Sequence, residues 1–250
     1  MIPVNPRKNR APQHVSNRHR FAEGIRMCAK SAHSRQSLAR PSATRLRRLA
    51  ALPILAATLL LTACGSDGPS GTTPTTEAPD PSRPPAGIHW ESYQGIQLPI
   101  GADGPKNLGT AATGYTHSPQ GAALAAINHN VRLSLAPDTT WPQIASQSLI
   151  PGPAKDNWVL SRSQISITSA ANPALAPRIT AYKINNYSAE RADLTVYSTY
   201  PDASITSAEQ VVLWVSEDWR LLLPDPVAKV PTVHSVSVIP EGVVTLPVVG

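Results

Sequence analysis

Residues 191–222 read RADLTVYSTYPDASITSAEQVVLWVSEDWRLL, and this segment determines the predicted fold class. From Arg191 to Tyr200, side chains alternate with the period of a half-buried β-strand. One face holds Ala192, Leu194 and Val196, and the other holds Thr195, Tyr197 and Thr199. Pro201-Asp202-Ala203 is typical of a turn, and residues 209–215 alternate again. Because the connections are short, the segment predicts an antiparallel meander.

The neighbouring residues extend this meander in both directions. Residues 178–186 alternate around Tyr182 and Ile184, and Ser188-Ala189-Glu190 marks a hairpin turn. Downstream, Ser216-Glu217-Asp218 turns the chain and residues 219–223 return, so we expect Trp214 and Trp219 to meet across that turn. The tail, residues 224–250, is rich in Val and Pro. It is expected either to supply an edge strand at residues 233–239 or to hang free.

Helical signals precede the strands. Ser118 followed by Pro119 is typical of a helix N-cap and first position. One apolar stripe then follows at Leu124, Ile127, Val131 and Leu135. We expect this helix to end near Ser134, before Pro137.

Two shorter helices are predicted next. Asp138-Thr139-Thr140 is expected to cap a helix over residues 141–149, and a third helix is expected over residues 155–167. Upstream, residues 89–109 are broken by Gly and Pro, which predicts short extended pieces with Trp90 and Tyr93 anchored on the core.

Helices followed by a meander predict an α+β fold, with short N-terminal helices packed on one face of a curved antiparallel sheet. This layout resembles the NTF2-like or cystatin-like cone over about residues 88–223. Residues 212–221 resemble the terminal hairpin of its exported members. Residues 114–123 resemble the start of the first helix in a family of uncharacterised secreted and lipidated envelope proteins of high-GC Gram-positive bacteria. Some relatives of this layout resemble VirB8-type domains of conjugation and type IV secretion systems.

The leader carries export signals. Residues 45–63 combine a basic start with an uncharged, mostly apolar run that is short for a membrane-spanning helix, which predicts a signal peptide. The run ends in Leu61-Thr62-Ala63-Cys64, which resembles a bacterial lipobox. That resemblance implies cleavage before Cys64 and a diacylglycerol on its thiol. The alternatives are an ordinary signal peptide or an N-terminal anchor with an incidental cysteine. The secretion-system relatives usually carry a transmembrane anchor instead.

The chain is thereby divided into five parts. Residues 1–44 are expected to be a basic disordered extension. The alternative is that the true start is Met27 and that the start was assigned too far upstream. The signal peptide follows at 45–63, then the lipidated cysteine with a flexible linker at 64–87, which lacks large apolar residues. Residues 88–223 form the predicted domain, and residues 224–250 form the tail.

Charge and cysteine content exclude several functions. Residues 1–63 hold 12 basic residues and one acid, whereas residues 64–250 hold 10 basic and 15 acidic residues. The exported part is therefore acidic, and we expect no nucleic-acid partner. The only cysteines are Cys28 and Cys64, so neither a disulfide nor a thiolate metal site is expected in the domain. No HExxH, GxSxG, GxGxxG or P-loop pattern occurs, and no cofactor is expected.

The remaining polar candidates have simpler structural explanations. His117 lies before the helix N-cap and is expected to help fix it, the alternative being a polar group at a pocket mouth. His129 lies opposite the apolar stripe and is expected to be exposed, the alternative being that it lines a second cavity. Glu217-Asp218 is expected to be a solvated hairpin tip. Cone enzymes use a buried Asp, Tyr or His, and the strand residues that could serve are Asp193, Tyr182, Tyr197 and Tyr200.

The expected function is that of a non-catalytic, lipid-anchored accessory protein on the extracytoplasmic face of the cell membrane. It is expected to engage an unidentified protein partner in the cell envelope, and the resemblance to VirB8-type domains implies a conjugation or secretion assembly as one setting. The only predicted functional residue is Cys64, as the lipidation site, with no catalytic, cofactor or metal residue. The alternative is a small-ligand binder, or an isomerase- or dehydratase-like enzyme, that uses the hollow of the cone.

Overall fold

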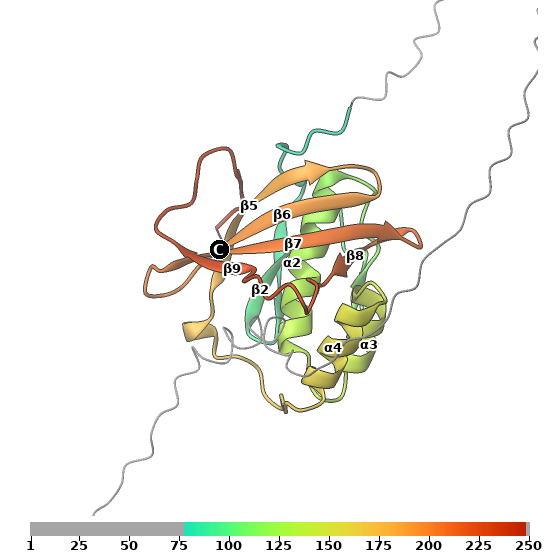
Figure 1. Cartoon of the computed structure of the whole chain (residues 1–250). Helices are drawn as coiled ribbons and strands as arrows, with labels where there is room; N and C mark the ends of the chain where they lie inside the picture. The colour runs from blue at the N-terminus through green and yellow to red at the C-terminus, as the bar shows by residue number, and fades with distance from the viewer. Residues whose placement is uncertain (1–77, 249–250) are drawn as a thin grey trace, which may run out of the picture. The chain divides into compact units, whose positions relative to one another are not determined.

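The computed structural model describes residues 78–248, and Figure 1 shows them as a mixed α/β domain. Cys64, the signal peptide and most of the predicted linker lie outside the described residues. Three α-helices occur in the described part: α2 (Pro119–Leu135), α3 (Trp141–Ser148) and α4 (Pro153–Arg162). No helix within residues 78–248 combines the length and the hydropathy needed to cross a bilayer.

An open antiparallel sheet forms the second half of the domain. Its main strands are β5 (Arg178–Tyr187), β6 (Arg191–Thr199), β7 (Ile205–Val215) and β8 (Asp218–Leu222). They run in the order β10-β5-β6-β7-β8, and β9 (Val233–Val236) pairs with the first part of β7. The predicted meander is confirmed. Of the two alternatives for the tail, the strand is the one that forms, although it ends at residue 236 rather than 239. The two-residue strand β10 (Val244–Thr245), which pairs with β5, was not predicted.

The alternation in β6 gives the sheet two different faces. Ala192, Leu194 and Val196 are buried against the helices, as the sequence predicted. Val212 of β7 pairs with Ala192 and is completely buried on the same side. Trp214 and Trp219 pair across the last turn with ring centroids 5.3 Å apart, so that prediction is also confirmed.

Helix α2 is the centre of the core. The Ser118 hydroxyl accepts a hydrogen bond from the Gly121 amide (3.0 Å), which confirms the predicted N-cap. The predicted single apolar stripe understates the burial, because 14 of the 17 residues of α2 are buried. A hairpin of β1 (His89–Tyr93) and β2 (Ile96–Ile100) packs beside the helix, which also contacts the sheet. Helix α2 therefore lies between two β-layers rather than on the surface of one.

The two later helices differ from prediction in their ends. Helix α4 begins two residues before the predicted start at residue 155 and ends five residues before the predicted end at residue 167. It ends where the Arg162 side chain turns back to donate to the Ala136 and Ile165 carbonyls (2.6 and 2.7 Å). Asp138 does not cap α3. Its carboxylate instead accepts from Arg162 (2.9 Å) and from the Ile167 amide (2.9 Å).

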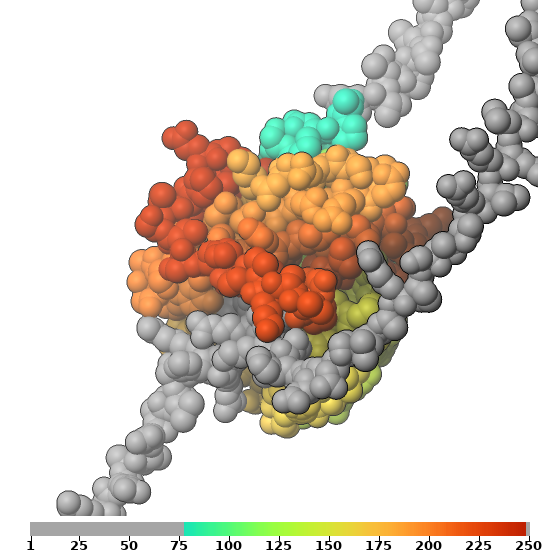
Figure 2. Space-filling view, viewed as in Figure 1, coloured from blue at the N-terminus to red at the C-terminus, as the bar shows by residue number. Residues whose placement is uncertain are grey.

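The folded part is longer than residues 88–223. The Gln120 amide nitrogen donates to the carbonyls of Asp80 (2.8 Å) and Arg83 (2.9 Å), and Pro85 is buried. The end of the predicted linker thus contacts the domain. At the other end, Val244 and Leu246 are buried, and Figure 2 shows the residues after Leu223 spread over the surface of the domain.

A small β-ribbon completes the domain. It consists of β3 (Asn107–Leu108) and β4 (Ala112–Thr113), which are paired antiparallel. A short 3-10 helix, Pro173–Leu175, precedes β5.

Candidate functional site

The space between α2 and the sheet is almost filled. The cavity there measures about 20 Å³ and is lined mainly by apolar side chains from α2 and the inner face of the sheet, among them Ile127, Ile179 and Val196. A volume of this size holds about one water molecule. This cavity is therefore too small for a substrate-sized molecule.

The strand residues named as enzyme candidates do not converge on that hollow. Tyr182 pairs with Val196 and faces the core, whereas Asp193 pairs with Val211 on the opposite face of the sheet. Asp193 is occupied by a two-pronged ion pair with Arg191, at 2.6 Å for the shortest nitrogen–oxygen distance. Tyr197 follows Asp193 by four residues and lies on that same outer face. Asp193 and Tyr182 thus lie on opposite faces of the sheet.

Tyr182 and Tyr200 both have a pKa that is raised by burial. Burial raises the pKa of Tyr182 strongly, and the nearby Asp103 carboxylate raises it further. Burial also raises the pKa of Tyr200, which hydrogen-bonds to Thr206. A phenol with a raised pKa stays neutral at physiological pH, so neither group is prepared to act as a base.

His129 is buried, and the prediction that it is exposed is wrong. It has no solvent exposure, and its Nε2 donates to the Trp219 carbonyl oxygen at 2.9 Å. Its other nitrogen, Nδ1, has no partner among the described residues. Burial lowers the pKa of His129 to about 4, so the imidazole is neutral at physiological pH. The prediction failed because α2 is covered on the side opposite its apolar stripe as well.

Asp218 is not a solvated turn residue, which corrects a second prediction. Its carboxylate accepts hydrogen bonds from the amides of Gly114 (2.8 Å), Tyr115 (3.0 Å) and Trp219 (3.0 Å). It therefore connects the last hairpin to the segment that leads into α2. Glu217, its neighbour, is exposed as expected. Asp218 acts as an acceptor for backbone donors.

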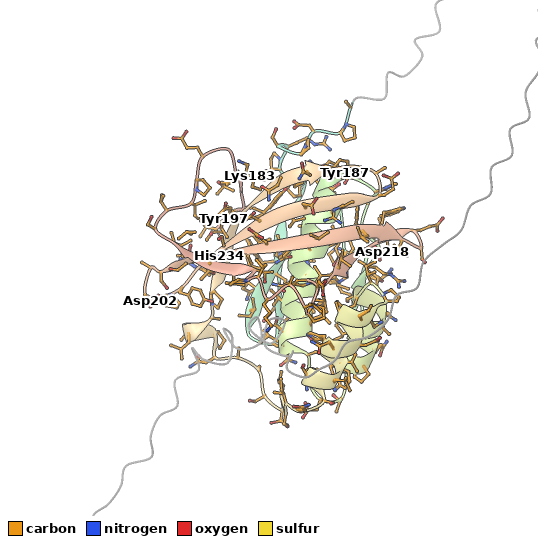
Figure 3. The ribbon with its side chains drawn as sticks, viewed as in Figure 1. Lys183, Tyr187, Tyr197, Asp202, Asp218 and His234 are labelled. Atoms are coloured by element: carbon orange, nitrogen blue, oxygen red, sulfur yellow. The ribbon has the colours of Figure 1, made fainter. Side chains whose placement is uncertain are left out.

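His117 does not form the helix cap, although it lies next to it. Its ring stacks on Trp214 with centroids 4.0 Å apart and planes 7° apart, and its Nε2 contacts the Ala189 carbonyl. The residue thus connects the start of α2 to two turns of the sheet. Figure 3 shows Asp218 at the end of the sheet away from His234, so these two titratable groups do not form a common site. Within residues 78–248, no group of three or more His, Cys, Asp or Glu side chains could hold a metal ion.

An open groove of about 430 Å³ lies on another part of the domain. Its walls come from α2, α4, the sheet and residues 224–232. The apolar part of its lining is Leu133, Trp158, Leu194, Val211, Leu221, Leu222, Leu223 and Val230. Val227 and Val230, on the segment that borders it, are 73% and 61% exposed. This cavity and its lining residues form the groove.

The groove carries excess negative charge. Arg191, Asp193, Glu209 and Asp225 line it, and the first two neutralise each other as an ion pair. Glu209 and Asp225 have no ion-pair partner within the part of the chain that the structure describes. An apolar surface with exposed valines and two carboxylates outside any ion pair is suited to a partner that presents apolar and basic side chains.

Sequence reasoning did not predict the groove. The nearest signal was Leu221-Leu222-Leu223, three consecutive apolar residues at the end of a strand, where one face should be polar. The position of the tail relative to this strand could not be deduced from local pattern.

Comparison with known families gives one match. Residues 59–240, which include Cys64 and the elements from β1 to β9, match a family described as a domain of unknown function (DUF8175). No curated protein and no solved structure matches the chain. Since the match covers more than half of the sequence, the chain belongs to the DUF8175 domain family.

Proposed function

We propose that this protein is a non-catalytic, lipid-anchored accessory protein of the extracytoplasmic membrane surface, which binds a protein partner through the groove. The observation that carries the binding role is the contrast between the two spaces. The hollow under the sheet measures about 20 Å³, whereas the groove measures about 430 Å³ and is open. An enzyme with a cone fold would need room for its substrate in the hollow, whereas a segment of a partner protein would bind in the groove.

The proposed anchor rests on residues outside the described domain. Leu61-Thr62-Ala63-Cys64 follows an apolar run with a basic start, and Cys64 lies inside the family match. The net negative charge after residue 63 is also consistent with export away from nucleic acid. The thiol of Cys64 would receive the lipid, and the folded domain would be held at the membrane by it.

The proposed fold relationship is to the NTF2-like cone and, through it, to envelope assemblies of the conjugation and secretion type. Helices that pack on a bent antiparallel meander support this proposal. The partner is proposed to be a protein segment with apolar and basic side chains, because the groove is apolar and acidic.

The anchor is tested by Cys64→Ser, with Cys28→Ser as the matched control, since these are the only two cysteines. We expect Cys64→Ser to remove the lipid mass from the mature protein and to shift it from the membrane fraction to the soluble fraction. Cys28→Ser should leave both unchanged. An unacylated wild-type protein, or unchanged membrane association of Cys64→Ser, would refute the anchor.

The partner site is tested by site-specific photo-crosslinking in intact cells. A photoreactive residue at Val230, in the groove, should give a discrete crosslinked band, and Val230→Lys or Leu222→Lys should reduce the yield from a second groove position. Leu175 is 42% exposed and does not line the groove, so it serves as the control position. Equal crosslinking from Leu175 and Val230 would contradict the proposal.

A further inference from the structure

Arg132 is a buried arginine whose charge is not paired. Its side chain is only 5% exposed, and its Nε has no hydrogen-bond partner. No ion pair or hydrogen bond to its guanidinium occurs among residues 78–248. Its guanidinium carbon lies 4.4 Å from the centroid of the Tyr93 ring, and Tyr115 is a further neighbour. A buried charge without a partner lowers the stability of the folded protein. The presence of Arg132 at this position therefore needs a functional explanation.

Arg132 lines a second cavity, which shares no lining residue with the groove. This cavity measures about 300 Å³ and lies between the β1–β2 turn, the β3–β4 turn and the end of α2. That volume is at the lower end of the range of small-molecule sites. The guanidinium is thus next to a space that a small ligand can enter.

The other polar side chains of this cavity are also free to bind. Ser92, Gln94, Thr110 and Thr140 line it, and none of their side chains has a hydrogen bond within the described residues. Thr140 precedes α3 at the N-cap position, yet its hydroxyl makes no cap hydrogen bond. A set of unpartnered hydroxyl and amide groups around one cation is the donor arrangement that an oxyanion requires.

The charges of the cavity select among anions. Burial lowers the pKa of Arg132, and the carboxylate of Glu91, which also lines the cavity, acts in the opposite direction. The two residues form no ion pair within residues 78–248. One carboxylate at the cavity opposes a dianion more than a monoanion. The planar guanidinium, with parallel N–H groups, matches a carboxylate in two-pronged geometry.

We infer that this cavity is a binding site for a carboxylate group, held by Arg132 and by the hydroxyls of Thr110 and Thr140. Tyr93 holds the guanidinium in position by stacking beneath it. The carboxylate belongs either to a small organic acid or to the C-terminus of a peptide, and both present the same group to Arg132.

The test uses isothermal titration calorimetry of the full-length chain with four probes: lactate, trialanine, trialanine amide and inorganic phosphate. We expect saturable binding of lactate, of trialanine or of both, and weaker or no binding of the amide and of phosphate. Binding of lactate alone identifies a free organic acid as the source, and binding of trialanine alone identifies a chain end.

Substitutions then assign the site. Arg132→Met keeps most of the side-chain bulk and should weaken carboxylate binding by roughly 10- to 150-fold, the loss of a charge-assisted hydrogen bond. Arg178→Met changes the same charge at an exposed position outside the cavity and should leave the affinity unchanged. Thr140→Val, which removes one hydroxyl, should weaken binding several-fold and provides a second measurement if Arg132→Met does not fold.

Three results would overturn the inference. The first is that neither carboxylate probe binds. The second is that phosphate or the amide binds as tightly as the carboxylates. The third is that binding is unchanged in a folded Arg132→Met protein, or, where that variant does not fold, in Thr140→Val.

Discussion

His129 should make this domain sensitive to mild acid. In the folded protein its Nε2–H donates to the Trp219 carbonyl, so the added proton must go to Nδ1. That nitrogen is buried and has no acceptor among the described residues. Burial accordingly lowers the pKa of His129 from 6.5 to about 4. The unfolded chain takes up a proton below its ordinary pKa, whereas the folded chain resists until the pH is near 4.

The sign and size of the effect follow from proton linkage. Between pH 6.5 and 4 the unfolded state binds more protons at this site, so the free energy of unfolding falls as the pH falls. The stability is fully present above pH 6.5. Each pKa unit corresponds to about 1.4 kcal/mol, so the loss is about 2 kcal/mol at pH 5 and about 3 kcal/mol at pH 4.

Urea denaturation followed by tryptophan fluorescence at pH 7, 6 and 5 measures this loss. His129→Gln keeps an N–H donor for the Trp219 carbonyl but cannot titrate in this range, so its stability should depend less on pH by about 2 kcal/mol between pH 7 and 5. His234→Gln removes an exposed histidine and should retain the wild-type dependence. If His129→Gln and wild type lose the same free energy, the assignment of the acid sensitivity to His129 is refuted.

Three further substitutions test the fold at other points. Asp218→Asn should lower the free energy of unfolding by about 2 kcal/mol, because the carboxylate accepts from backbone amides, including that of Gly114; an unchanged urea midpoint would contradict this. Gly121→Ala should destabilise by about 1–2 kcal/mol despite the better helix propensity of alanine, since a Cβ there would lie 2.1 Å from the Thr116 carbonyl oxygen; a higher melting temperature would show that α2 shifts at little cost. Asp138 has a pKa lowered to about 2 by hydrogen bonds, so its contribution is present above pH 3.8 and is lost as the pH falls toward 2; Asp138→Asn should reduce the acid sensitivity in that window alone, as measured by fluorescence between pH 4 and 2.

Several features could be read from the chain without the structure because they depend on neighbouring residues. Ser118-Pro119 starts α2 through its own backbone, and strand alternation places Ala192, Leu194 and Val196 on one face whatever packs against it. The pairing of Trp214 with Trp219 follows from a tight turn. The lipobox resemblance at Cys64 is likewise a local pattern, and it remains a prediction.

The environment of individual polar groups was decided by elements distant in the chain. Asp218 receives hydrogen bonds from residues more than 100 positions away, and His129 bonds to a carbonyl 90 positions away. No local pattern reports such a partner. A histidine on the polar side of a helix is exposed or buried according to whether a second layer covers that side.

The burial of Arg132 was also decided by elements distant in the chain, and so was the difference between the filled hollow and the open groove. The absence of a charged face on α2 was the available signal, since a helix covered on all sides carries few charges. Periodicity specifies which side chains point inward. The side chains can fill the hollow or leave a groove open beside it. Which of these occurs depends on the volumes of side chains from distant parts of the chain, so it is determined only by the tertiary structure.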